Sequence, residues 1–153
     1  MSREGELMRK AIKRHLLPAL ERLGFTGTSS KFQRLLPESQ DLLAIQYFKY
    51  GGSFILEFGR RERGSLHTGW GPVVPEEKLE VIYLPVTLRG RLQETEAETE
   101  AEADILFAGF SFRDFGEEVD TYDKLAKRVA GLLPQIDAWL STGAKGPNVH
   151  TFG

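Results

Sequence analysis

The chain has 153 residues, of which 41% are hydrophobic and 27% charged, a composition typical of one soluble globular domain and not of a disordered chain. It contains no cysteine, which excludes disulfide bonds and thiolate metal sites. The net charge of −2 and the isoelectric point near 6.0 argue against a nucleic acid as the partner.

No stretch of the sequence approaches the roughly 18 consecutive apolar residues that a membrane-spanning helix needs. Residues 1–15 alternate charged with apolar side chains and lack the continuous apolar core of a signal peptide. We therefore expect a cytoplasmic protein without a membrane partner.

Helical periodicity dominates the N-terminal region. Apolar residues recur at helical spacing over residues 4–23, and Gly24 follows them in the position where glycine commonly ends a helix. Pro18 lies inside this pattern and removes one backbone donor, so we expect the helix to bend there.

Strand patterns follow over residues 31–36, which alternate weakly, and over 42–50 and 53–61, which are rich in β-branched and aromatic residues. Gly51 and Gly52 between the last two predict a β-hairpin with a two-residue turn. Residues 79–92 predict one or two further strands interrupted at Pro85, and residues 105–112 predict another.

The C-terminal third combines an acidic segment with a helix. Residues 93–104 carry an acid at every second position and no apolar stripe, which predicts a solvated insert, either an irregular excursion or an exposed helix. A helix is expected from Asp120, as its N-cap, to Leu140, followed by a flexible tail at 143–153. The predicted fold is α+β: within a single domain at 1–142, an N-terminal helix, a largely antiparallel sheet of four to six strands, and a C-terminal helix packed on one face.

Motifs for catalysis, cofactors and metals are weak. The three histidines are far apart in sequence, and Gly59–Ser65 lacks the lysine and the helix of a phosphate-binding loop. No serine lies in a nucleophile elbow, and Glu57, on a strand, is expected to face water. We therefore predict no catalytic residue, no cofactor and no metal, with an enzyme using Glu57 or His67 as the weakest hypothesis.

Arginine-rich segments are the main candidates for a binding site. Arg89 and Arg91 are two residues apart on a predicted strand and so share a face, and guanidinium groups suit carboxylate or phosphate ligands. If their segment meets the arginines after residue 59, up to five guanidinium groups converge. The candidate ligand- or partner-binding residues are Arg60, Arg61, Arg63, His67, Trp70, Arg89 and Arg91. The alternative is that the arginines are solvated charges that protect a sheet edge and that Trp70 covers one end of the core.

Several segments together resemble a known bacterial family. They are "HLLPALERLGF", "KFQRLL", "LLAIQYFKYGGSFILEFG" and "LRGRL", followed by a strand and a final helix. In this order they are similar to the family catalogued as domain of unknown function 4304, over most of residues 8–140. The chain departs from it at 60–75 and 94–104. The resemblance implies a small bacterial α+β domain without an assigned activity, so it supplies no functional residues.

Two functional hypotheses follow. The first is a non-enzymatic domain that binds another protein, in a sharper version an immunity protein whose acidic segment mimics nucleic acid. Charge complementarity would contribute, because residues 1–64 carry 12 Lys and Arg against 7 Asp and Glu, whereas residues 65–153 carry 8 against 15. The alternative is a binder of a small anionic ligand that uses the arginine cluster. A ligand site requires that the arginines converge in a cavity, and a partner surface requires an exposed apolar patch rimmed by charge. The oligomeric state stays open.

Overall fold

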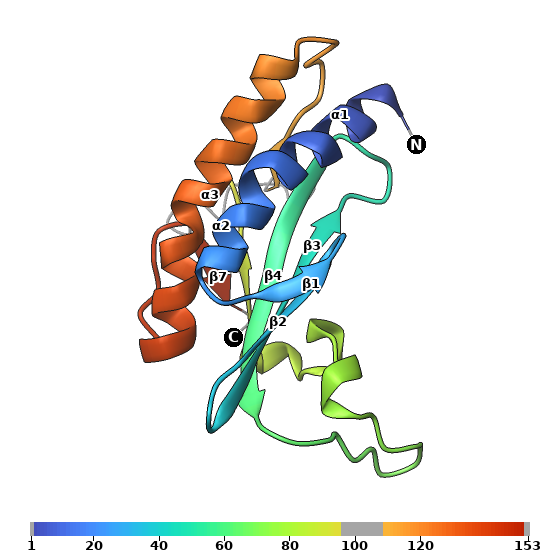
Figure 1. The fold of residues 1–153 in the computed structure, drawn as a ribbon, viewed down its shortest axis with the longest axis vertical. Helices are drawn as coiled ribbons and strands as arrows, with labels where there is room; N and C mark the ends of the chain where they lie inside the picture. The colour runs from blue at the N-terminus through green and yellow to red at the C-terminus, as the bar shows by residue number, and fades with distance from the viewer. Residues whose placement is uncertain (1, 96–108, 152–153) are drawn as a thin grey trace.

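The computed structural model describes residues 2–95 and 109–151. It confirms the α+β class: helices at both ends of the chain pack on one face of an antiparallel sheet (Figure 1). The helices are α1 (Arg3–Ala11), the π-helix η1 (Ile12–Leu16), α2 (Leu17–Arg22), the 3₁₀ turns η2 (Glu76–Lys78), η3 (Val81–Tyr83) and η4 (Val86–Leu88), and α3 (Val119–Thr142). The strands are β1 (Thr26–Thr28), β2 (Lys31–Leu35), β3 (Ser39–Tyr47), β4 (Ser53–Glu62), β5 (Arg89–Leu92), β6 (Phe110–Ser111) and β7 (Val149–Thr151).

The sheet is built around β4. Its order is β1-β2-β3-β4-β5-β7, and β6 pairs with β4 beyond the end of β5, so β4 contacts three neighbours. All pairs are antiparallel. The described residues thus form seven strands, where the sequence predicted four to six.

The N-terminal helical region changes its hydrogen-bond pattern just before Pro18. The N–H of Leu17 donates to the carbonyl of Ile12, five residues back, in the wide π-turn immediately before Pro18. Gly24 adopts a φ of +94° and ends the helix, with Phe25 N–H donating to Leu20 O in the pattern of a Schellman motif. The glycine stop is therefore confirmed.

The β3–β4 hairpin is also confirmed, but its turn is longer than two residues. Strand pairing ends at Tyr47 and Phe54, and the N–H of Gly51 donates to the carbonyl of Phe48 to close the turn. Gly51 and Gly52 have φ of +85° and +87°, the left-handed region that glycine adopts without strain.

The main core lies between the sheet and the helices. Phe54, Leu56 and Phe58 share the helix-facing side of β4, as residues two apart on a strand do, and all three are buried. The buried face of α3 is formed by Tyr122, Leu125, Ala126, Val129, Leu133, Ile136 and Leu140, whereas Leu132 is half-buried. Asp120 lies in the first turn of α3, and Glu118, not Asp120, is the N-cap.

Two predictions about chain segments are wrong. Residues 79–88 form 3₁₀ turns instead of a strand, and only residues 89–92 pair in the sheet. The flexible tail is contradicted by Val149–Thr151, which pairs with β5 and buries Val149 and His150. Most of the acidic insert predicted at 93–104, and residues 105–108 of the last predicted strand, lie outside the described residues.

Within the described ranges, no helix combines the length and the apolar character that a membrane crossing requires.

Candidate functional site

Arg60 belongs to a buried ion network on the helix-facing side of the sheet. Its Nε lies 2.7 Å from Oδ1 of Asp41, which is fully buried, and Arg34 approaches Oδ2 of the same carboxylate to 2.8 Å. Arg34 also contacts Asp137 of α3 at 2.9 Å. The hydrogen bond with Asp41 raises the pKa of Arg60 further. Arg60 thus connects the end of β4 to β3 and, through Arg34, to β2 and α3.

Arg61 and Arg63 hold the backbone where β4 ends. Arg61 Nη1 donates to Gln40 Oε1 at 3.0 Å and to the carbonyl of Gly64 at 2.7 Å. Arg63 donates to both carboxylate oxygens of Glu76 at 2.9 Å. This fork-to-fork contact, together with the N–H of Gly64, lowers the pKa of Glu76 to about 2.

Arg89 and Arg91 contact Glu57 on the opposite side of the sheet. Arg89 Nη1 lies 3.1 Å from Oε1 and Arg91 Nε lies 3.3 Å from Oε2 of this carboxylate, whose side chain is 1% exposed. The expectation that Glu57 faces water is therefore wrong. Arg89 also donates to the carbonyls of Leu84 and Ile82, at 2.8 Å each. It fixes the 3₁₀ segment to the sheet.

The two arginine groups meet in the sheet but do not converge on one point. Arg89 pairs in register with Gly59, so it lies on the face opposite to the adjacent Arg60. Each group has its own carboxylate acceptor within the protein. In this geometry the arginines satisfy internal carboxylates and carbonyls.

His67 and Trp70 lie in an exposed excursion after β4. An isolated bridge between Leu66 and Val74 closes the excursion, and the Trp70 side chain is 95% exposed. Trp70 therefore does not cover the end of the core, and it lies apart from the buried arginine contacts. Figure 1 shows this green segment projecting beyond the lower end of the sheet.

An exposed apolar surface, which the sequence did not predict, lies on residues 82–88. Ile82 is 65% exposed, and Tyr83, Val86 and Leu88 are between 46% and 51% exposed. We call these four side chains the 82–88 apolar surface. The signal in the sequence was the continuous run "LEVIYLPVTL", which lacks a strand's alternation and contains a proline.

A second, smaller core holds this surface in place. Leu79, Val81 and Leu84 are buried against Leu42 on the side of the sheet opposite the helices. The short turns η3 and η4 therefore direct some apolar residues inward and leave others in water. Packing into the smaller core gives Leu79, Val81 and Leu84 a structural role but gives none to the four exposed side chains.

A cavity of about 520 Å³ adjoins the 82–88 apolar surface. Its walls combine Tyr83, Pro85 and Leu88 with the charged residues Glu38, Arg61 and Glu62. The apolar surface is thus bordered by charges of both signs.

His15 is half-buried, and its Nε2 lies 2.9 Å from Oδ1 of Asp123, which Arg14 also contacts. Both basic groups, Arg14 foremost, lower the pKa of Asp123. Among residues 2–95 and 109–151, no three His, Asp or Glu side chains are placed to hold a metal ion.

No protein family model, curated protein or solved structure matches this chain.

Proposed function

We propose that this protein is a non-enzymatic bacterial domain that binds another protein through the 82–88 apolar surface. The bacterial assignment rests on the sequence resemblance described above. The observation that carries the binding role is the exposure of four large apolar side chains within seven residues. Single exposed apolar residues are normal, but a contiguous group rimmed by charge is typical of a protein interface.

The rigidity of the segment supports this role. Arg89 donates to two carbonyls of the segment, and Leu79, Val81 and Leu84 anchor it from below. A surface held in this way loses little conformational entropy when a partner binds. Tyr83 adds an aromatic side chain with a hydroxyl group, a type enriched among the residues that dominate binding energy.

The charged rim suits a partner with complementary charges around an apolar centre. Arg61, Glu62 and Glu38 lie beside Tyr83 and Leu88, so charge pairing would set the orientation and the association rate more than the affinity. An immunity-like role is one version of this proposal. The anion-binding alternative through Arg60, Arg61, Arg63, Arg89 and Arg91 has less support, because these groups already have acceptors.

The test compares partner capture by two double variants. Ile82→Ser with Val86→Ser removes the two most exposed side chains of the 82–88 apolar surface, whereas Tyr50→Ser with Val119→Ser removes two exposed apolar residues elsewhere. A partner captured from the source organism by the wild-type chain is purified, and its affinity for each variant is measured by calorimetry.

We expect the 82/86 variant to bind at least about tenfold more weakly, since central interface residues each contribute on the order of 1–2 kcal/mol. The 50/119 variant should bind like the wild type. Equal affinity of both variants would contradict the assignment of this surface.

A further inference from the structure

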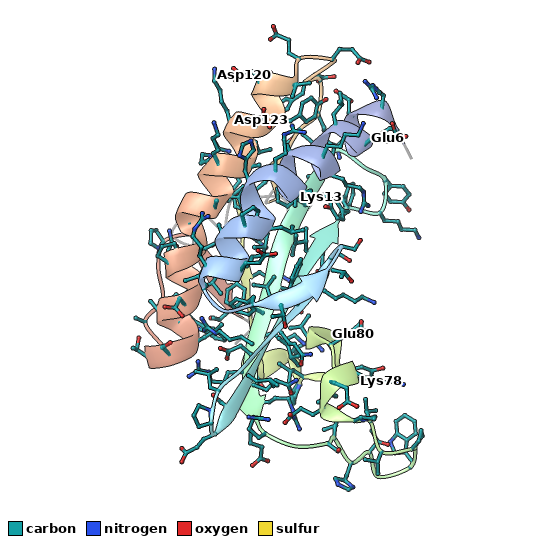
Figure 2. All side chains as sticks on the ribbon, viewed as in Figure 1. Glu6, Lys13, Lys78, Glu80, Asp120 and Asp123 are labelled. Carbon is teal, nitrogen blue, oxygen red and sulfur yellow. The ribbon has the colours of Figure 1, made fainter. Side chains whose placement is uncertain are left out.

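A second cavity, of about 430 Å³, lies between the N-terminal helices and the ends of β1 and β3. Its volume falls within the roughly 300–1,000 Å³ that small-molecule sites occupy. The side chains that matter here are Arg9, Ile12, Lys13, Leu17, Ser29 and Tyr47. Figure 2 shows Lys13 on the helical segment, above the tips of these two strands in this view.

The two cations of this cavity differ from the arginines at the end of β4. Arg9 and Lys13 are four residues apart across the junction of α1 and η1, so they lie on one flank of the helix. Throughout residues 2–95 and 109–151, no carboxylate pairs with either cation, and no Asp or Glu lines the cavity. Among the described residues, therefore, no ion pair neutralises these two positive charges.

The ring of Tyr47 orients Arg9 but does not neutralise its charge. Its guanidinium carbon lies 3.7 Å from the centre of the Tyr47 ring, a cation–π contact. Burial raises the pKa of Tyr47, so the phenol stays neutral and adds no negative charge. A stacked guanidinium keeps its N–H groups at the edge free for a carboxylate or phosphate.

The backbone around the cavity is unusual in two places. The π-turn Ile12–Leu16, which precedes Pro18, carries Lys13. Opposite it, Ser29 has a φ of +63°, in a tight turn between β1 and β2 where glycine is preferred. The residue at this position is a serine, and it lines the cavity.

From these features we propose that the cavity binds a small organic anion, with its carboxylate or phosphate between Arg9 and Lys13 and an apolar body against Ile12 and Leu17. Ile12 is buried and Leu17 half-buried, so together they offer an apolar wall beside the charges. The Ser29 and Thr28 hydroxyls supply hydrogen bonds at the opposite wall. This site does not depend on the protein-binding role, because it uses none of the residues of the 82–88 apolar surface.

The test is an NMR titration of the ¹⁵N-labelled protein with four probes. Phenyl phosphate and benzoate carry both charge and ring, inorganic phosphate carries charge alone, and benzyl alcohol carries the ring alone. We expect one or both ring-bearing anions to bind with a dissociation constant on the order of 1 mM, as suits fragments of this size. Which of them binds more tightly distinguishes phosphate from carboxylate. The shifted amides should cluster at residues 9–17 and 27–29.

Two variants with the same change in charge provide the control. Arg9→Gln with Lys13→Gln removes the cations of the cavity, whereas Lys10→Gln with Arg22→Gln removes two exposed cations of the same helical region that do not line it. All four side chains lie outside the main core, and circular dichroism checks that both variants fold.

The 9/13 variant should bind the ring-bearing anion at least about tenfold more weakly, and the 10/22 variant within about twofold of the wild type. Equal weakening in both variants would mean attraction to net charge alone and would overturn the site. Absence of binding at millimolar concentrations, equal binding of benzyl alcohol, or shifts scattered over the surface would overturn it as well.

Discussion

Replacing Asp41 with asparagine removes a buried charge that lies against two guanidinium groups inside the sheet. Asp41 is fully buried, with Arg60 at 2.7 Å and Arg34 at 2.8 Å. Both arginines are themselves mostly buried, with 28% and 11% of their side chains exposed. Because Asn presents a donor where Asp presented an acceptor, the variant loses hydrogen bonds as well as charge.

The expected cost follows from this burial. Breaking a buried ion pair from one side costs about 3–5 kcal/mol, since the remaining charge stays desolvated. Asp137 still contacts Arg34, and Arg60 can turn partly toward water, so we expect the lower end, about 3 kcal/mol. For a chain of this size the melting temperature should fall by roughly 6–12 °C.

Urea denaturation followed by circular dichroism measures the effect, with an unchanged m-value as the sign that only stability changed. The matched control is Asp120→Asn, which breaks the exposed Asp120–Lys124 pair in α3 and should cost about 1 kcal/mol or less. If Asp41→Asn costs no more than this control, the carboxylate is not the centre of a buried network and the reasoning fails.

Three further changes test other contacts. Arg89→Met removes the donors to the 3₁₀ segment, so hydrogen exchange at 79–88 should quicken while α3 stays protected. Asp123→Asn should lower stability at neutral pH by up to about 1 kcal/mol. Because Arg14 holds the pKa of Asp123 below 3.8, this difference from the wild type should shrink as the pH falls below that value. Gly59→Ala would place a methyl group 2.7 Å from a backbone oxygen at the end of the same segment, and urea unfolding should show a loss of about 1–3 kcal/mol.

The hairpin and the main core were predictable because they depend on local patterns. Phe54, Leu56 and Phe58 alternate along β4, and this alternation alone specifies which face meets the helices. The glycines after Tyr50 likewise predict a reversal of the chain, although the turn length depends on strand register, which sequence does not specify.

The burial of Glu57 was not predictable in the same way. Its strand neighbours give no sign of it, because the two arginines that compensate its charge come from β5, more than thirty residues later. A carboxylate on a strand is ordinarily solvated. Here the register of β4 with β5 places Arg89 and Arg91 beside Glu57, and their charges offset the cost of burying it. For the same reason, nothing in the sequence indicated that Arg89 and Arg91 have a carboxylate partner.

Short elements were missed where tertiary contacts outweigh local preference. Val149–Thr151 has only three residues, too few for a pattern, yet its pairing with β5 buries Val149. Residues 79–88 have strand-like composition, but Pro85 and the contact of Leu84 with Gly59 favour tight turns packed on the sheet. These turns direct Leu79, Val81 and Leu84 into the smaller core and leave the side chains of the 82–88 apolar surface exposed.

The two proposed sites should act independently, because they adjoin separate cores on opposite faces of the sheet. Ile12 belongs to the core between sheet and helices, whereas Leu84, below the 82–88 apolar surface, belongs to the smaller core on the other face. Effects of changes at sites without shared contacts generally add. The 9/13 variant should therefore retain the affinity for the protein partner, and the 82/86 variant should retain the affinity for the ring-bearing anion. Loss of both activities in either variant would show that the two surfaces are parts of one site, or that the substitutions alter the fold.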